Sequence, residues 1–241
     1  MCRWLAYSGA PIFLDEVLFK TEHSLIDQSL HALDTTNTTN GDGFGVGWYG
    51  SRDLPGVYKD IRPAWNDRNL QALAGQIESP MFLAHVRATT GSAVQRTNCH
   101  PFDHDKWLFV HNGLVNEYAV LRRDLMLAIS PELFPLIEGT TDSEVLFLLA
   151  LTVGMQGDVQ AGLSRMAGLV EQLAAQHGVP DAVQLTLGLS DGESLYAVRY
   201  SSSGKSRSLF HSADRDTTME IAPEAGRFSR DARAIVSEPL S

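Results

Sequence analysis

The chain begins Met1-Cys2-Arg3-Trp4-Leu5-Ala6-Tyr7-Ser8, so a cysteine is its second residue. These residues predict a β-strand that starts at the terminus and ends at Gly9-Ala10-Pro11. Methionine aminopeptidase removes Met1 when the next side chain is small, which leaves Cys2 with a thiol and a free α-amine. An α-amine has a pKa near ~8, so its neutral fraction can accept the thiol proton at cytosolic pH. Cys2 therefore suits a nucleophile that carries its own base, and it also suits a small buried residue at the start of a strand.

Length, composition and charge limit the class of protein. The 241 residues, 44% of them hydrophobic, suffice for a sizeable core. The net charge of −10, without any basic cluster interleaved with aromatic residues, argues against nucleic acid or an anionic membrane as a partner. Neither a signal-peptide pattern nor an apolar run of roughly 18 residues occurs, so no membrane segment is expected. With Cys2 and Cys99 as its two cysteines, the chain suits a reducing compartment, and we expect it in the cytoplasm.

The hydrophobic patterns along the chain predict an α+β fold. The expected helices cover residues 14–20, 25–33, 117–128, 145–151 and 159–176. The expected strands cover residues 2–8, 41–50, 81–87, 107–111, 184–189, 194–200, 208–210 and 232–236, with 201–206 as a hairpin loop. Two antiparallel sheets packed face to face, with helices outside them, would account for this order in a single domain over residues 1–241.

Three local patterns add detail to these elements. Asn116 suits the N-cap of the helix that follows it. Thr141-Asp142-Ser143-Glu144 is a capping-box pattern, and the helix behind it is apolar on every side and should be buried. The glycines of residues 41–50 suit a strand that another backbone or a ligand approaches closely.

Polar residues that suit amide chemistry follow two of the expected strands. At Asn112-Gly113 a side-chain N–H and a backbone N–H can point at one oxyanion, and the same pair also suits an ordinary turn. Arg87, with Thr89 and Thr90 close to it in sequence, can bind a carboxylate bidentately or form a structural ion pair. Asp142, in the first turn of its helix, can hold an ammonium group or act only as a helix cap. Together, an arginine for a carboxylate and an aspartate for an ammonium describe a site for an α-amino acid.

Four motifs together resemble a known family. They are Met1-Cys2, His85-Val86-Arg87-Ala88-Thr89-Thr90-Gly91, His111-Asn112-Gly113 and Thr141-Asp142-Ser143-Glu144. Their order and spacing are similar to those of the class II glutamine amidotransferases, which are N-terminal-nucleophile hydrolases. Residues 41–49 and 97–102 resemble the stand-alone branch, which includes the YafJ-like proteins and the γ-glutamyl hydrolases of ergothioneine synthesis.

The resemblance implies a four-layer αββα sandwich in which Cys2 attacks the side-chain amide of glutamine. Asn112 and Gly113 would form the oxyanion hole, Arg87 with Thr90 would hold the α-carboxylate, and Asp142 would hold the α-ammonium. Water would then hydrolyse a γ-glutamyl thioester, giving glutamate and ammonia or an amine. No cofactor is implied. The chain departs from the sugar-phosphate branch, which has an aromatic residue after the arginine and a histidine before the glycine.

Other interpretations of these residues stay open at the level of the sequence. Cys99, His100, His104 and His111 lie close together, but their spacing matches no standard zinc pattern, and we expect no metal. His85 is interpreted as a core residue with satisfied hydrogen bonds. A non-catalytic or regulatory binding module is the alternative to an enzyme.

The fate of the nitrogen is a second open question. The chain has no room for a synthase domain, which leaves hydrolysis alone, a separate synthase subunit, or a γ-glutamyl compound as the true substrate. Because the sequence stops soon after a strand-like run, a C-terminal truncation is a further hypothesis.

Overall fold

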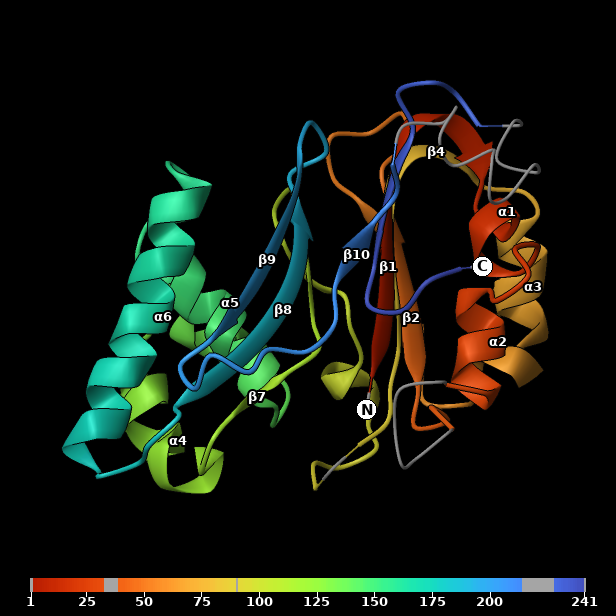
Figure 1. The fold of residues 1–241 in the computed structure, drawn as a ribbon. Coiled ribbons are helices and arrows are strands. Elements are labelled where there is room, and N and C mark those ends of the chain that lie inside the picture. Colours follow the sequence, from red (N-terminus) through yellow and green to blue (C-terminus); the bar gives the residue numbers. More distant parts are fainter. Residues whose placement is uncertain (1, 33–38, 90, 214–227, 241) are drawn as a thin grey trace. The chain divides into compact units, whose positions relative to one another are not determined.

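The computed structural model describes residues 2–32, 39–89, 91–213 and 228–240 (Figure 1). Its strands are β1 (Arg3–Phe13), β2 (Phe44–Trp48), β3 (Gly56–Asp60), β4 (Glu78–Val86), β5 (Phe102–His104), β6 (Trp107–His111), β7 (Leu114–Val115), β8 (Val183–Ser190), β9 (Leu195–Ser201), β10 (Phe210–His211) and β11 (Arg233–Val236). Its α-helices are α1 (Asp15–Leu18), α2 (Leu25–Leu30), α3 (Arg68–Ala74), α4 (Tyr118–Leu127), α5 (Asp142–Thr152) and α6 (Val159–Gln176). Within the described residues, every helix is too short or too polar to cross a membrane.

The chain forms two compact units. The first comprises residues 1–112, 187–197 and 208–241, and the second comprises residues 113–186 and 198–207. The unit boundaries fall inside β8 and inside β9, so two strands contribute residues to both units.

The first unit contains a six-stranded sheet in the order β10-β11-β1-β4-β2-β3. Side chains of β1 alternate between its two faces, as the pleat of a strand requires. Leu5 and Tyr7 pack in a cluster with Leu14 and Val17, on the face that α1, α2 and α3 cover (Figure 1). Strand β1 is therefore buried on this face by the helices.

The opposite face of β1 packs against a second sheet. Trp4 and Ala6 join Leu108 and Val110 of β6 in another buried cluster. Strand β6 pairs antiparallel with β5 on one side and with the end of β8 on the other. The first unit thus has the order of helices, sheet and sheet that the sequence predicted for this part of the chain.

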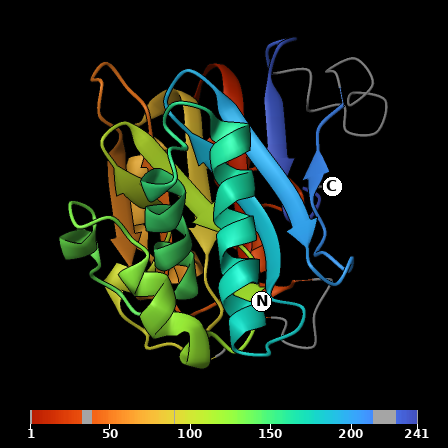
Figure 2. The same ribbon diagram turned by 90° about the vertical axis from the view of Figure 1, so that its left-hand side faces the viewer.

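The second unit is built around helix α5. Its residues 143–151 are all buried, as expected for a helix that is apolar on every side. It packs against α4 and α6, and β7 pairs with the start of β8 (Figure 2). Thr141 caps α5 by accepting a hydrogen bond from the Glu144 backbone N–H, so this part of the predicted capping box is confirmed.

Several expectations about single elements were wrong. Strand β1 does not end at Gly9-Ala10-Pro11, because a register shift between Ser8 and Ile12 accommodates these residues and the strand continues to Phe13. The cap of α4 is Glu117 in the left-handed region, and the side-chain amide of Asn116 instead donates to the Pro180 carbonyl.

The predicted hairpin over residues 201–206 was also wrong. Strand β9 pairs with β8, whereas β10 pairs with β11, so the two flanking strands belong to different sheets. Strand β3 and helix α3 were missed altogether by the sequence patterns.

Candidate active site

Cys2 directly precedes β1, a central strand of the first sheet, and lies next to the C-terminal end of β4. Arg3 pairs with Val86, so the residues that follow β4 lie beside Cys2. The Cys2 thiol donates to the carbonyl oxygen of Ala88 at 3.6 Å, and its side chain is half-buried. The thiol therefore lies directly beside the backbone that follows Arg87.

Asn112 lies at the same end of the first unit as Cys2. The Tyr49 hydroxyl, at the end of the sheet that is remote from Cys2, donates to the Lys106 carbonyl just before β6. At the other end of β6, Val110 packs in one cluster with Trp4. Strand β6 therefore runs toward the nucleophile, and Asn112, which is buried, follows its last residue.

Arg87 is buried and is held by neutral oxygens. Its guanidinium donates to the Asp42 carbonyl at 3.2 Å and to the Ser92 hydroxyl at 2.6 Å, with further contacts to Thr89 and the Ala93 carbonyl. Among the residues that the structure describes, no carboxylate forms an ion pair with it. Within this part of the chain the guanidinium therefore contacts neutral oxygens, and the alternative of a structural ion pair is not seen there.

Asp42 supports the segment after β4, and the sequence alone did not indicate it. Its carboxylate accepts from the Thr89 N–H at 2.8 Å, and its own N–H donates to the Arg87 carbonyl at 3.0 Å. The neighbouring Gly43 has φ of +115°, which favours glycine, and a Cβ there would lie 2.6 Å from the Cys99 sulfur. The feature of the sequence that could have indicated Asp42 is its position between two glycines. Thr90, predicted to bind with Arg87, lies outside the described residues.

Gly113 and Asp142 belong to the second unit. One carboxylate oxygen of Asp142 accepts from the Val115 N–H at 2.8 Å, and the other accepts from the Ser143 N–H at 2.8 Å. Asp142 therefore contacts Val115 of β7, which is two residues after Gly113, and two backbone N–H groups orient its carboxylate.

Two histidines, His85 of β4 and His100, are buried in the first unit. The rings of His85 and His100 stack with centroids 4.1 Å apart. Among the described residues, the ring nitrogens of His100 have no hydrogen-bond partner, and the His111 backbone is the hydrogen-bonding group next to the His85 ring. Burial, and after it the charge of Arg87, lowers the pKa of His85 to about 3, and burial also lowers the pKa of His100. Both rings are neutral near pH 7, and the expectation that His85 is a core residue is confirmed by its burial.

The described residues contain no group of three His, Cys, Asp or Glu side chains that could hold a metal ion. No disulfide joins Cys2 and Cys99.

Comparison with known proteins places the chain in a family. Residues 20–217 match the family model described as class-II glutamine amidotransferases. A probable glutamine amidotransferase, DUG3 of Saccharomyces cerevisiae, is 42% identical over 160 residues, which are 63% of this chain and 45% of that protein. A gamma-glutamyl-hercynylcysteine sulfoxide hydrolase of Mycolicibacterium smegmatis is 32% identical over 123 residues, which are 48% of this chain and 52% of the relative. The chain spans about half the length of these curated relatives.

Solved structures agree with this assignment. A glutamine aminotransferase class-II domain protein from Silicibacter pomeroyi superimposes with a TM-score of 0.74 and 35% identity, over 98% of this chain and 88% of that one. The glutamine phosphoribosylpyrophosphate amidotransferase of Bacillus subtilis, 13% identical, shares the fold with a TM-score of 0.64, over 98% of this chain and 42% of that one. These neighbours confirm the predicted α+β fold of the N-terminal-nucleophile type. The chain belongs to the class II glutamine amidotransferases.

Proposed function

We propose that this protein hydrolyses the side-chain amide of glutamine or of a γ-glutamyl amide, with Cys2 as the nucleophile. The observation that carries the proposal is the position of Cys2 at the start of the central strand β1, beside the backbone that follows Arg87 and at the same end as Asn112. A thiol, a buried cation and an amide donor thus lie at one end of the strands of the first unit. The names of the relatives, an amidotransferase and a γ-glutamyl hydrolase, agree with this chemistry.

The first half of the reaction forms a thioester. With Met1 removed, the α-amine of Cys2 accepts the thiol proton, and the sulfur adds to the amide carbonyl. The amine then gives the proton to the departing nitrogen, so the C–N bond breaks as ammonia or an amine leaves. Water adds to the γ-glutamyl thioester in the second half, releasing glutamate and restoring the thiol. His85 is neutral near pH 7, and the nucleophile supplies its own base, so no histidine is needed.

The oxyanion of each tetrahedral intermediate needs hydrogen-bond donors. We assign this role to the side-chain amide of Asn112 and the backbone N–H of Gly113. Removing one such donor typically costs about 10²–10³ in rate.

The amino-acid end of the substrate needs opposite charges. Arg87, held by neutral oxygens, is assigned to the α-carboxylate together with Thr90. Asp142, whose carboxylate is oriented by two backbone N–H groups, is assigned to the α-ammonium. A substrate that lacks either charged group should therefore bind poorly.

We further propose that residues 1–241 act as one domain in the cytoplasm on a small-molecule substrate. Strands β8 and β9 contribute to both units, which supports folding as one domain. Such a site could serve in three ways: hydrolysis of glutamine alone, supply of ammonia to a separate synthase subunit, or hydrolysis of a γ-glutamyl compound as the true substrate.

The experiment is the release of glutamate from L-glutamine and from a series of γ-glutamyl amides with larger leaving amines. Cys2→Ala should lower turnover at least about 10⁴-fold in folded protein. Cys99→Ala is the matched control, because Cys99 is the other cysteine of the chain and is fully buried, and it should keep its turnover. Faster turnover of the amides than of glutamine would identify a dedicated γ-glutamyl hydrolase.

Intact mass completes the test, since active protein should lack Met1. Activity that survives in Cys2→Ala, or active protein that retains Met1, would contradict the mechanism. A processed but inactive protein would favour the non-catalytic binding module.

A further inference from the structure

A buried ion pair lies directly behind the nucleophile. The Arg3 Nε donates to a carboxylate oxygen of Glu238 at 2.5 Å, and the two side chains are only 3% and 4% exposed. Burying two charges costs desolvation free energy that their attraction barely recovers, so apolar side chains would stabilise this position about as well. Stability alone therefore does not account for a charged pair at this position.

Arg3 connects this pair to the backbone of Cys2. Its Nη1 donates to the Cys2 carbonyl oxygen at 3.0 Å. By the alternation of β1, Arg3 shares a face with Leu5 and Tyr7 on the side of the helices. Cys2 shares the opposite face with Trp4. The guanidinium therefore holds the peptide group of the nucleophile from behind, on the face away from the thiol.

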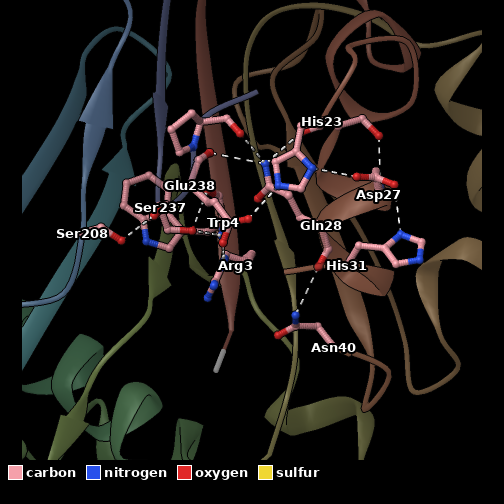
Figure 3. A network of polar contacts seen from close by, with 12 residues as sticks. Arg3, Trp4, His23, Asp27, Gln28, His31, Asn40, Ser208, Ser237 and Glu238 are labelled. Atoms are coloured by element: carbon pink, nitrogen blue, oxygen red, sulfur yellow. Dashed lines mark hydrogen bonds and ion pairs between the residues drawn. The ribbon is translucent and has the colours of Figure 1, made fainter. Parts of the chain in front are cut away.

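Glu238 is itself fixed from several sides (Figure 3). Its second carboxylate oxygen lies 2.6 Å from His23 Nε2, and its carbonyl accepts from the Gln28 side chain at 3.3 Å. The preceding Ser237 accepts from the Trp4 N–H at 2.9 Å and donates its own N–H to the Trp4 carbonyl at 3.0 Å. The segment after β11 is thus hydrogen-bonded on one side to α2 and the residues just before it, and on the other side to the first residues of β1.

This support matters because Cys2 would carry nucleophile and base together. After removal of Met1 no peptide bond precedes Cys2, so its carbonyl is the main backbone group by which the protein can orient it. Fixing that oxygen fixes the plane of the Cys2–Arg3 peptide group, and with it the position of the Cys2 Cα that carries both the thiol and the amine. Misplacing a reacting group by 1 Å can cost about 10²-fold in rate.

We propose that Arg3 and Glu238 are positioning residues that hold the peptide group of Cys2 in its reactive orientation. The proposal rests on the hydrolytic function of Cys2 proposed above. It adds two residues from opposite ends of the chain that touch no substrate.

The test compares Arg3→Lys and Glu238→Gln with wild type. Lysine keeps the charge but, as a single ammonium, cannot bind the carbonyl and the carboxylate with the fixed fork of arginine. We expect Arg3→Lys to lower kcat about 10²-fold and Glu238→Gln about tenfold, with KM for the best substrate changed less than about threefold. The double variant should lose little more than Arg3→Lys alone, because the two side chains act as one unit.

Asp67→Asn is the control for stability. Asp67 is a buried carboxylate of the same unit, and it contacts Leu70, Tyr58 and Arg62 instead of the nucleophile. This variant should unfold at a lower temperature and keep its kcat. The proposal would be overturned if Arg3→Lys and Glu238→Gln fold and keep kcat within twofold of wild type. It would also be overturned if, at equal stability, these variants lose no more kcat than Asp67→Asn does.

A second readout is independent of turnover. The rate at which iodoacetamide alkylates Cys2 at pH 7, measured on processed protein, should fall at least about threefold in Arg3→Lys and stay unchanged in Asp67→Asn. If wild-type protein hydrolyses no substrate, the proposed function fails, and this rate alone decides the positioning role. An unchanged rate in both Arg3→Lys and Glu238→Gln would reject it.

Discussion

At the scale of single residues, the neutral pair His85 and His100 couples the stability of the protein to pH. Burial disfavours the charged ring, so the pKa of His85 falls to about 3, whereas an unfolded histidine titrates near ~6.5. Between these two pH values the unfolded chain binds more protons than the folded one, so stability must fall as the pH falls. The stabilisation that comes from the neutral rings should be fully present above about pH 6.5. The same neutrality excludes His85 as a general acid near pH 7.

We predict that His85→Phe flattens this dependence. Between pH 6.5 and 4, His85 contributes up to about 1.4 kcal/mol per pH unit to the loss of unfolding free energy, and phenylalanine cannot titrate. Urea unfolding at several pH values measures the slope for the variant and for wild type. His211→Gln is the control, because this histidine is exposed. Equal slopes for wild type and His85→Phe would show that the ring is not held neutral.

At the scale of elements, the glycines of β2 set how closely a neighbouring segment approaches the first sheet. A Cβ added at Gly45 would lie 2.2 Å from the His100 carbonyl oxygen, a backbone atom that cannot easily move away. The expectation that these glycines admit another backbone is confirmed. Because the ring of His100 stacks on that of His85, this contact also fixes the pair of histidines.

We predict that Gly45→Ala destabilises the protein by about 1–3 kcal/mol through overpacking. Gly168→Ala in α6 is the matched control, because a Cβ there meets nothing within 4 Å. It should stabilise the helix by about 0.4–1 kcal/mol. Denaturant unfolding of the two variants gives the comparison, and a Gly45→Ala protein as stable as wild type would refute the tight contact.

At the scale of the whole molecule, two cysteines in very different surroundings report its folding. Cys2 is half-buried, whereas Cys99 is fully buried, and burial raises the pKa of the Cys99 thiol. The Cys99 thiol also donates to the Asp60 carbonyl at 3.5 Å. A thiol reagent attacks the thiolate, so Cys99 should be protected until the unit around it opens.

We predict that native protein takes up one thiol label and unfolded protein takes up two. Mass spectrometry along a urea gradient should show the second label appearing together with the loss of helical circular dichroism. Cys2→Ala protein should take up no label in the native state. Labelling of Cys99 well below the unfolding midpoint would reveal local opening of the first unit and contradict the prediction.

The sequence alone indicated the residues of the candidate site and the strongest elements of this protein. Cys2 as the second residue, Arg87 after an apolar run and Asn112 after another were found because a side chain and its place at a strand end are local properties. Strand β6 and helix α6 were predicted with both boundaries correct, since their apolar periodicity is strong and their flanks are polar or glycine-containing. The amidotransferase family was expected from the same local motifs.

Only the tertiary structure decided which distant segments meet. Arg3 and Glu238 lie 235 positions apart, and the pairing of β10 with β11 instead of β9 depends on both strands meeting in one sheet. Nothing in the residues around Glu238 indicates its partner. Such contacts form when the packing of whole segments compensates the entropy of closing long loops. The sequence therefore determined which groups are present, and the long-range packing decided which of them lie beside Cys2.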